Sequence, residues 1–92
     1  MAELPAEIAS MRAAVDEVDH ALLELCARRR ALVASLLAAK RELGLALLDP
    51  GREDVLLAER RAFAEGVGVP ADLAETLFRA LLEGSHAEIN KL

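Results

Sequence analysis

The fold is decided by residues 8–43, which read IASMRAAVDEVDHALLELCARRRALVASLLAAKREL. Steps of three and four residues visit eleven positions, ten of them apolar: Ile8, Met11, Val15, Val18, Leu22, Leu25, Arg29, Leu32, Leu36, Ala39 and Leu43. That alternation is typical of a long helix with a coiled-coil-like seam. Neither proline nor glycine occurs between Pro5 and Gly44, so the pattern predicts one helix from about residue 7 to 43.

Such a helix is too long to be covered by a compact chain of 92 residues. A helix of about 36 residues spans about 54 Å, whereas a compact domain of this size has a radius of gyration of about 13 Å. The far end of the helix must therefore pack on another molecule, and a homodimer is the simplest solution. The chain itself is expected to form a single domain over residues 1–92.

Two shorter helices are expected after the long one, which makes the chain all-α. Asp49-Pro50 reads as an N-cap followed by proline at the first helical position, and it predicts a helix over about 50–65. Pro70 opens a third helix over about 70–90. The composition is rich in Ala, Leu, Glu and Arg, which favours helix throughout.

The composition argues against several classes of partner. A formal net charge of −5 disfavours nucleic acid and anionic membranes, and no apolar run approaches the ~20 residues that cross a bilayer. The acidic start does not resemble a signal peptide. Cys26 is the only cysteine, which disfavours a disulfide framework or a thiolate metal site and favours the cytoplasm. His20 and His86 lack partners at metal-ligand spacing and are interpreted as structural or surface residues.

Cationic residues interrupt the apolar pattern of the long helix. Arg29 lies in the seam, where a buried cation needs an anion nearby, and Lys40 is only about 20° off the same line. Arg12 lies about 25 Å away along the axis, so it can reach this groove only from the partner chain of an antiparallel or crossed dimer. Arg29 and Lys40 also have simpler interpretations, Arg29 as part of a solvated helix turn and Lys40 as a partner of the helix dipole.

Polar residues of the shorter helices are further candidates. Arg52 stands in the first turn of the second helix, whose N-terminus favours anions, and Asp49 and Glu53 can orient it. Ser85 interrupts the apolar face of the third helix. Capping is sufficient to explain Asp49, and a small core residue is the simpler interpretation of Ser85. No single residue carries a functional hypothesis.

In combination, these positions resemble the all-helical class of chorismate mutases from about residue 8 to 89. The resemblance is carried by Met11-Arg12, Val15-Asp16-Glu17-Val18-Asp19, Leu22-Leu23-Glu24-Leu25, Arg28-Arg29, Ala39-Lys40, Asp49-Pro50-Gly51-Arg52-Glu53 and Leu77-Phe78-Arg79 through Ser85. It implies an intertwined homodimer of three-helix chains. It also implies the Claisen rearrangement of chorismate to prephenate, in phenylalanine and tyrosine synthesis, with neither cofactor nor metal.

The resemblance implies a role for each cation. Arg29, together with Arg12 of the partner chain, would grip the carboxylates of the dianionic substrate, for which the planar guanidinium is suited. Lys40 would donate to the ether oxygen and to a carboxylate. Arg52 would assist near the ring.

The resemblance also assigns the acceptors and exposes one departure. Asp49 and Glu53 would accept from the ring hydroxyl, and Ser85 would contact a carboxylate. Four residues after Ser85 the family places a Gln or Glu that hydrogen-bonds the ether oxygen, and this chain has Ile89 there. Losing one such donor typically costs ~10²–10³ in rate, so weak activity or an activating partner enzyme is an open alternative.

Three other interpretations stay open at this point. Relatives that act as isochorismate pyruvate lyases or 4-amino-4-deoxychorismate mutases tend to carry an apolar residue where this chain has Glu53, which favours chorismate here. A non-catalytic helical dimer is supported only by Ile89. The sequence leaves undecided whether the protein serves primary or specialised metabolism.

Overall fold

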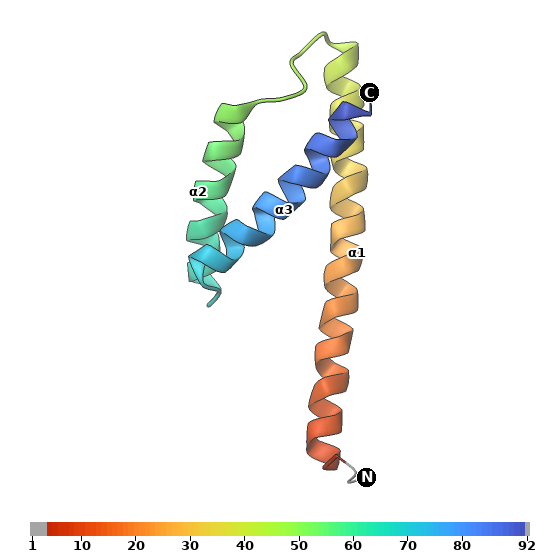
Figure 1. Ribbon diagram of the computed structural model, residues 1–92, viewed down its shortest axis with the longest axis vertical. Coiled ribbons are helices and arrows are strands. Elements are labelled where there is room, and N and C mark those ends of the chain that lie inside the picture. The colour runs from red at the N-terminus through yellow and green to blue at the C-terminus, as the bar shows by residue number, and fades with distance from the viewer. Residues whose placement is uncertain (1–3, 92) are drawn as a thin grey trace. The chain divides into compact units, whose positions relative to one another are not determined.

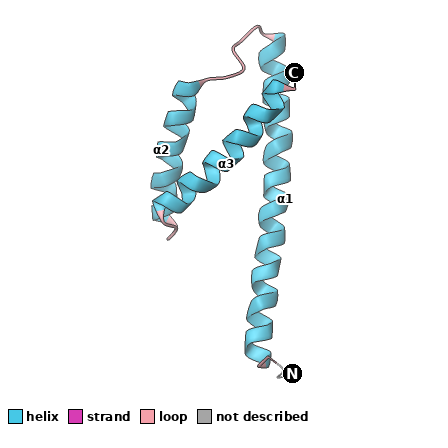
Figure 2. Ribbon diagram, viewed as in Figure 1, coloured by secondary structure: helices cyan, strands magenta, loops and turns pink. Residues whose placement is uncertain are grey.

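The computed structural model describes residues 4–91, and every regular element in that range is a helix (Figures 1 and 2). Helix α1 spans Ala6–Glu42, α2 spans Pro50–Gly66 and α3 spans Ala71–Asn90. The prediction of an all-α chain with one long and two shorter helices is confirmed. The chain divides into two compact units, Met1–Leu32 and Val33–Leu92, and each is considered by itself below.

Helix α1 ends in a Schellman motif at Gly44. The N–H of Leu45 donates to the carbonyl of Lys40 at 2.9 Å, and the N–H of Gly44 donates to the carbonyl of Arg41 at 3.2 Å. Gly44 has a φ of +69°, a left-handed conformation that glycine adopts without steric cost. The helix therefore stops where the sequence predicts, with Lys40 and Arg41 in its last turn.

Helices α2 and α3 form an antiparallel hairpin. Late α2 meets early α3 through Arg61, which donates to Asp72 and Glu75, whereas early α2 meets late α3 through Glu53 and His86. The turn repeats the Schellman pattern around Gly68, whose φ is +81°. These contacts fix which ends of the two helices lie together.

The core of the second unit is small. Its buried apolar side chains are Leu37, Leu56, Leu57, Ala64 and Ala74. The guanidinium of Arg60 also lies 5.6 Å from the ring centre of Phe78, which joins α2 to α3 by a cation–π contact. Leu37 is 6 % exposed, whereas Leu36, a member of the predicted seam, is 54 % exposed. The face of α1 that is covered within this unit is thus rotated by about 100° from the seam.

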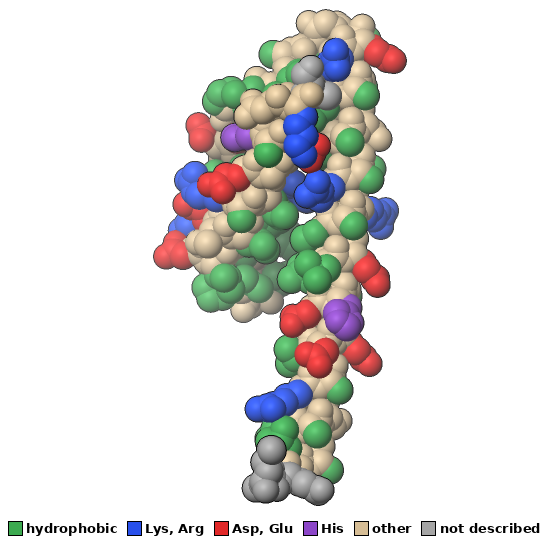
Figure 3. All heavy atoms as spheres, turned by 45° about the vertical axis from the view of Figure 1, so that its right-hand side comes forward, with side chains coloured by type: hydrophobic (Ala, Val, Ile, Leu, Met, Phe, Trp, Pro, Cys, Tyr) green, Lys and Arg blue, Asp and Glu red, His purple; other side chains and the backbone are tan. Residues whose placement is uncertain are grey.

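In the first unit, the seam residues of α1 lie open to solvent. Val18 is 66 % exposed, and Met11, Val15 and Leu25 are exposed as well. Figure 3 shows hydrophobic side chains reaching the surface along the N-terminal half of α1. Apolar surface of this extent usually marks an interface. No helix within residues 4–91 is long and apolar enough to span a membrane.

Candidate active site

Lys40 is held at the end of α1 by the backbone that terminates the helix. Its carbonyl accepts the hydrogen bond from Leu45, so the position of its Cα is defined. The side chain is half-buried, and within residues 4–91 no acceptor binds its ammonium group. Because a half-buried cation loses hydration without gaining a counterion, this position favours an anionic ligand.

The N-terminus of α2 is built by Asp49. Its Oδ1 accepts a hydrogen bond from the backbone N–H of Arg52 at 3.0 Å, with Pro50 at the first helical position. The expected N-cap is confirmed. One carboxylate oxygen of Asp49 is therefore committed to the helix, and the other is available to a ligand. Arg52 is exposed, and its guanidinium makes no hydrogen bond or ion pair with residues 4–91.

Glu53 has an unexpected partner. Its Oε1 is hydrogen-bonded to Nε2 of His86 on α3 rather than to the neighbouring Arg52. The side chains are 24 % exposed for Glu53 and 41 % for His86. From the sequence, His86 was interpreted only as a structural or surface residue. No sequence pattern predicts a contact between two residues that are 33 positions apart on different helices.

A hollow of about 220 Å³ lies beside this pair, between early α2 and late α3. It is lined by Pro50, Glu53, Asp54, Leu57, Arg79, Leu82, Glu83 and His86. Its polar side chains are three carboxylates, one guanidinium and one imidazole. Only Glu53 among the predicted site residues lies in its wall.

The last turns of α3 hold Ser85 and the residues around Ile89. The hydroxyl of Ser85 is half-buried and donates to the carbonyl of Leu81 at 3.2 Å, one turn back in the same helix. In this structure the hydroxyl proton is used in a hydrogen bond within the helix, and the oxygen lone pairs remain available to accept. Ile89 is half-buried and supplies no polar group.

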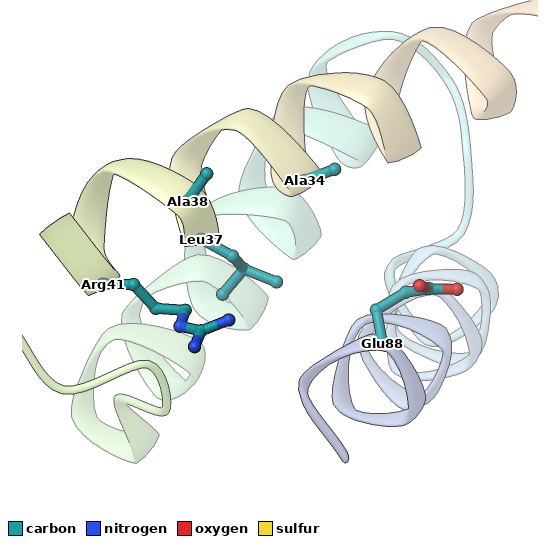
Figure 4. A pocket seen from close by; sticks show the side chains of 5 residues that line it. All are labelled: Ala34, Leu37, Ala38, Arg41 and Glu88. Carbon is teal, nitrogen blue, oxygen red and sulfur yellow. The ribbon is translucent and has the colours of Figure 1, made fainter. Parts of the chain in front are cut away.

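Glu88, rather than Ile89, presents a polar side chain toward the end of α1. It lines a hollow of about 140 Å³ with Ala34, Leu37, Ala38 and Arg41 (Figure 4). On an ideal helix, Glu88 lies about 100° around the axis from Ile89. The structure therefore puts a carboxylate, and no amide, close to the segment of α1 that carries Lys40.

Arg12 and Arg29 belong to the first unit. Arg12 is exposed and Arg29 is half-buried. Their places relative to Lys40 and Glu53 stay predictions. Cys26 is half-buried. Within the described residues, no group of three or more His, Cys, Asp or Glu side chains could hold a metal ion.

The fold and these residues define a class: a small all-helical protein with one long helix and with cations and carboxylates as its candidate site residues. Comparison with known families identifies the class more closely. The chain belongs to the chorismate mutase type II family, whose profile matches residues 11–88. All seven predicted site residues fall inside the matched range.

Individual relatives agree with this assignment. The chain is 42 % identical over 85 residues to the T-protein of Enterobacter agglomerans and 36 % identical over 81 residues to that of Haemophilus influenzae. These matches cover 92 % and 88 % of this chain but only 23 % and 22 % of the relatives, so the chain spans about a quarter of their length. The chorismate mutase of Methanocaldococcus jannaschii is 28 % identical over 81 residues, 88 % of this chain and 82 % of that protein. No solved structure gives a significant match.

Proposed function

We propose that this chain is a chorismate mutase, an isomerase that rearranges chorismate to prephenate in aromatic amino-acid biosynthesis. One observation carries the proposal: the family match spans residues 11–88, a range that includes every position at which a substrate contact is predicted. The name of the Methanocaldococcus jannaschii relative, which is aligned over most of its own length, supports the same activity.

The reaction suits the side chains that the site offers. It is an intramolecular rearrangement of a flexible dianion, so catalysis needs a compact reactive conformer and positive charge near the breaking C–O bond. The half-buried ammonium of Lys40 would supply that charge at the ether oxygen. Arg29, with Arg12 from the partner chain, would hold the two carboxylates by bidentate hydrogen bonds.

The second and third helices would orient the ring. Asp49 and Glu53 each keep a carboxylate oxygen available to accept from the ring hydroxyl, since each uses only one oxygen in the structure. Arg52 would lie near the ring, at the helix N-terminus that favours anions. Ser85 would contact a carboxylate by turning its hydroxyl proton from the carbonyl of Leu81 to the substrate.

We further propose an intertwined homodimer in the cytoplasm, each protomer a single domain that supplies Arg12 to the other's site. The exposed apolar seam of α1 supports it, because Met11, Val15 and Val18 need a cover that the described part of the chain does not provide. Closed two-fold symmetry would give two identical sites per dimer. An activating partner enzyme would compensate for Ile89.

The test is turnover of chorismate by the purified chain, with the product identified by ¹H NMR. Prephenate should form, and Lys40→Ala and Arg29→Ala should lower kcat/KM by at least about 10² with the helical content unchanged. Lys91→Ala and Arg28→Ala, which change exposed cations, are the matched controls. No prephenate from a folded dimer, with no rise in melting temperature at saturating chorismate, would contradict the proposal.

A further inference from the structure

The Glu53–His86 contact joins the start of α2 to the end of α3. Nε2 of His86 lies within hydrogen-bond distance of Oε1 of Glu53, and both side chains are partly shielded. The two residues are 33 positions apart, so the contact depends on the folded hairpin and not on a local turn. It lies at the end of the hairpin opposite to the connection at Gly68.

The bond restrains a side chain that is otherwise flexible. A glutamate has three side-chain torsions and loses rotamer freedom on ordering, which costs free energy whenever a ligand must do the ordering itself. In the folded chain that restraint is already present. Since one oxygen accepts from His86, the carboxylate keeps Oε2 for a second donor.

The surroundings make His86 the available donor. The other charged groups lining the same hollow are Asp54 on α2 and Glu83 on α3, which only accept, and Arg79. Nε of Arg79 donates to Glu75 at 3.0 Å, so this guanidinium is drawn toward Glu75, one turn earlier in α3. His86 is thus the side chain in this wall that orients Glu53.

We propose that His86 is a positioning residue: it holds the Glu53 carboxylate so that its second oxygen accepts from the ring hydroxyl of the substrate. The inference rests on the proposed function, because Glu53 needs a hydroxyl donor to act on. It assigns no contact between His86 and the substrate. The arrangement lowers the entropic cost of binding, and its effect falls on substrate affinity.

The test compares His86→Leu, which removes the donor, with His86→Gln, whose amide keeps an N–H at similar reach. A contact made equally in the bound substrate and the transition state affects KM and not kcat. His86→Leu should therefore raise KM by about tenfold with kcat within about threefold, while His86→Gln should restore most of the affinity. His20→Leu, the same change at an exposed position of α1, should leave both constants unchanged.

A double-mutant cycle distinguishes two roles of His86: orienting the Glu53 carboxylate, and holding α2 and α3 together. In a Glu53→Gln background, His86→Leu should add no further rise in KM, because the group that it positions is already altered. A structural role would instead lower the melting temperature of His86→Leu and leave KM at the parent value, which would overturn the inference. His86→Asn, too short to reach Glu53, repeats the test without an added apolar side chain.

The two proposals fail in different ways. A parent chain that turns over chorismate, with a His86→Leu variant of unchanged KM, overturns the role of His86 alone. A folded parent chain that neither binds nor converts chorismate overturns the proposed function and this inference with it.

Discussion

Nη1 of Arg61 on α2 lies 2.8 Å from Oδ1 of Asp72 on α3, across the turn that joins the two helices. The same nitrogen lies 3.1 Å from Oε1 of Glu75, whose other oxygen, Oε2, accepts from Nε of Arg79 at 3.0 Å. The hydrogen bond with Asp72 raises the pKa of Arg61, and the hydrogen bond from Arg79 is the main cause that lowers the pKa of Glu75. This cluster ties the two helices together at the end away from Glu53 and His86.

The lowered pKa of Glu75 predicts how its contribution to stability depends on pH. A carboxyl group whose pKa is lower in the folded state stabilises the fold above its unfolded value of 4.5 and loses that effect as the pH falls through the folded value. Glu75→Gln should therefore lower the melting temperature by a few degrees at pH 7 and by nothing in strong acid. The difference in melting temperature between Glu75→Gln and the parent is measured by circular dichroism at a series of pH values from 7 to 2.

The control for Glu75→Gln is Glu65→Gln. Glu65 is exposed and makes no ion pair with the described residues. Its melting temperature should follow that of the parent at every pH. A difference at Glu75 that persisted in acid would show that the ion pairs are not its cause.

Asp49 has a structural role that can be separated from its predicted contact with the substrate. Asp49→Ala removes the oxygen that accepts from the N–H of Arg52 and should destabilise the chain by about 1 kcal/mol. Asp49→Asn keeps an N-capping oxygen and should leave the melting temperature close to that of the parent. If Asp49 also accepts from the ring hydroxyl, Asp49→Asn should still raise KM. If KM of Asp49→Asn equals that of the parent, Asp49 acts only as the N-cap of α2 and makes no contact with the substrate.

The helices were predictable from the sequence because residues close to each helix end determine where it begins or stops. Gly44 ends α1 with a left-handed turn, and Asp49-Pro50 begins α2 with a cap and a preset φ. These signals act within a few residues, so a single sequence reveals them. The all-α architecture follows from them and from the unbroken run before Gly44.

The partners of surface-facing side chains were not predictable. Leu36 and Leu37 are both apolar and differ by one step of the helix, so nothing in the sequence tells which of them α1 turns toward its own chain. The contact between Glu53 and His86 depends on the crossing of α2 and α3, which no periodicity encodes. The sequence therefore identified Glu53 as a candidate and missed the residue that orients it.

The proposal that Arg12 acts in the partner's site predicts complementation between two inactive variants. Arg12→Ala and Lys40→Ala each destroy both sites of a homodimer if Arg12 acts in the partner's site. Unfolding the two variants together and refolding them as a mixture should restore roughly a quarter of the parent activity, because half the dimers are mixed and each has one intact site. Chorismate consumption measures the recovery.

The matched control mixes Lys40→Ala with Arg29→Ala, both assigned to the same protomer's site. Every site in a mixed dimer then carries one defect, and no activity should return. Equal recovery in both mixtures, or none in the first, would contradict a site shared between chains.

Ile89 predicts a gain of function. The resemblance to chorismate mutases implies a hydrogen-bonding side chain at this position, where this chain has the half-buried Ile89. Ile89→Gln should raise kcat by up to about 10², since one preorganised donor at the developing negative charge of the ether oxygen is worth that much. KM should change little, because the charge develops only in the transition state. Asn90→Gln, an exposed change one residue further on, is the control and should leave kcat unchanged. A drop in kcat for Ile89→Gln would instead show that the apolar side chain is part of this chain's own site, with the hydrogen bond supplied from elsewhere.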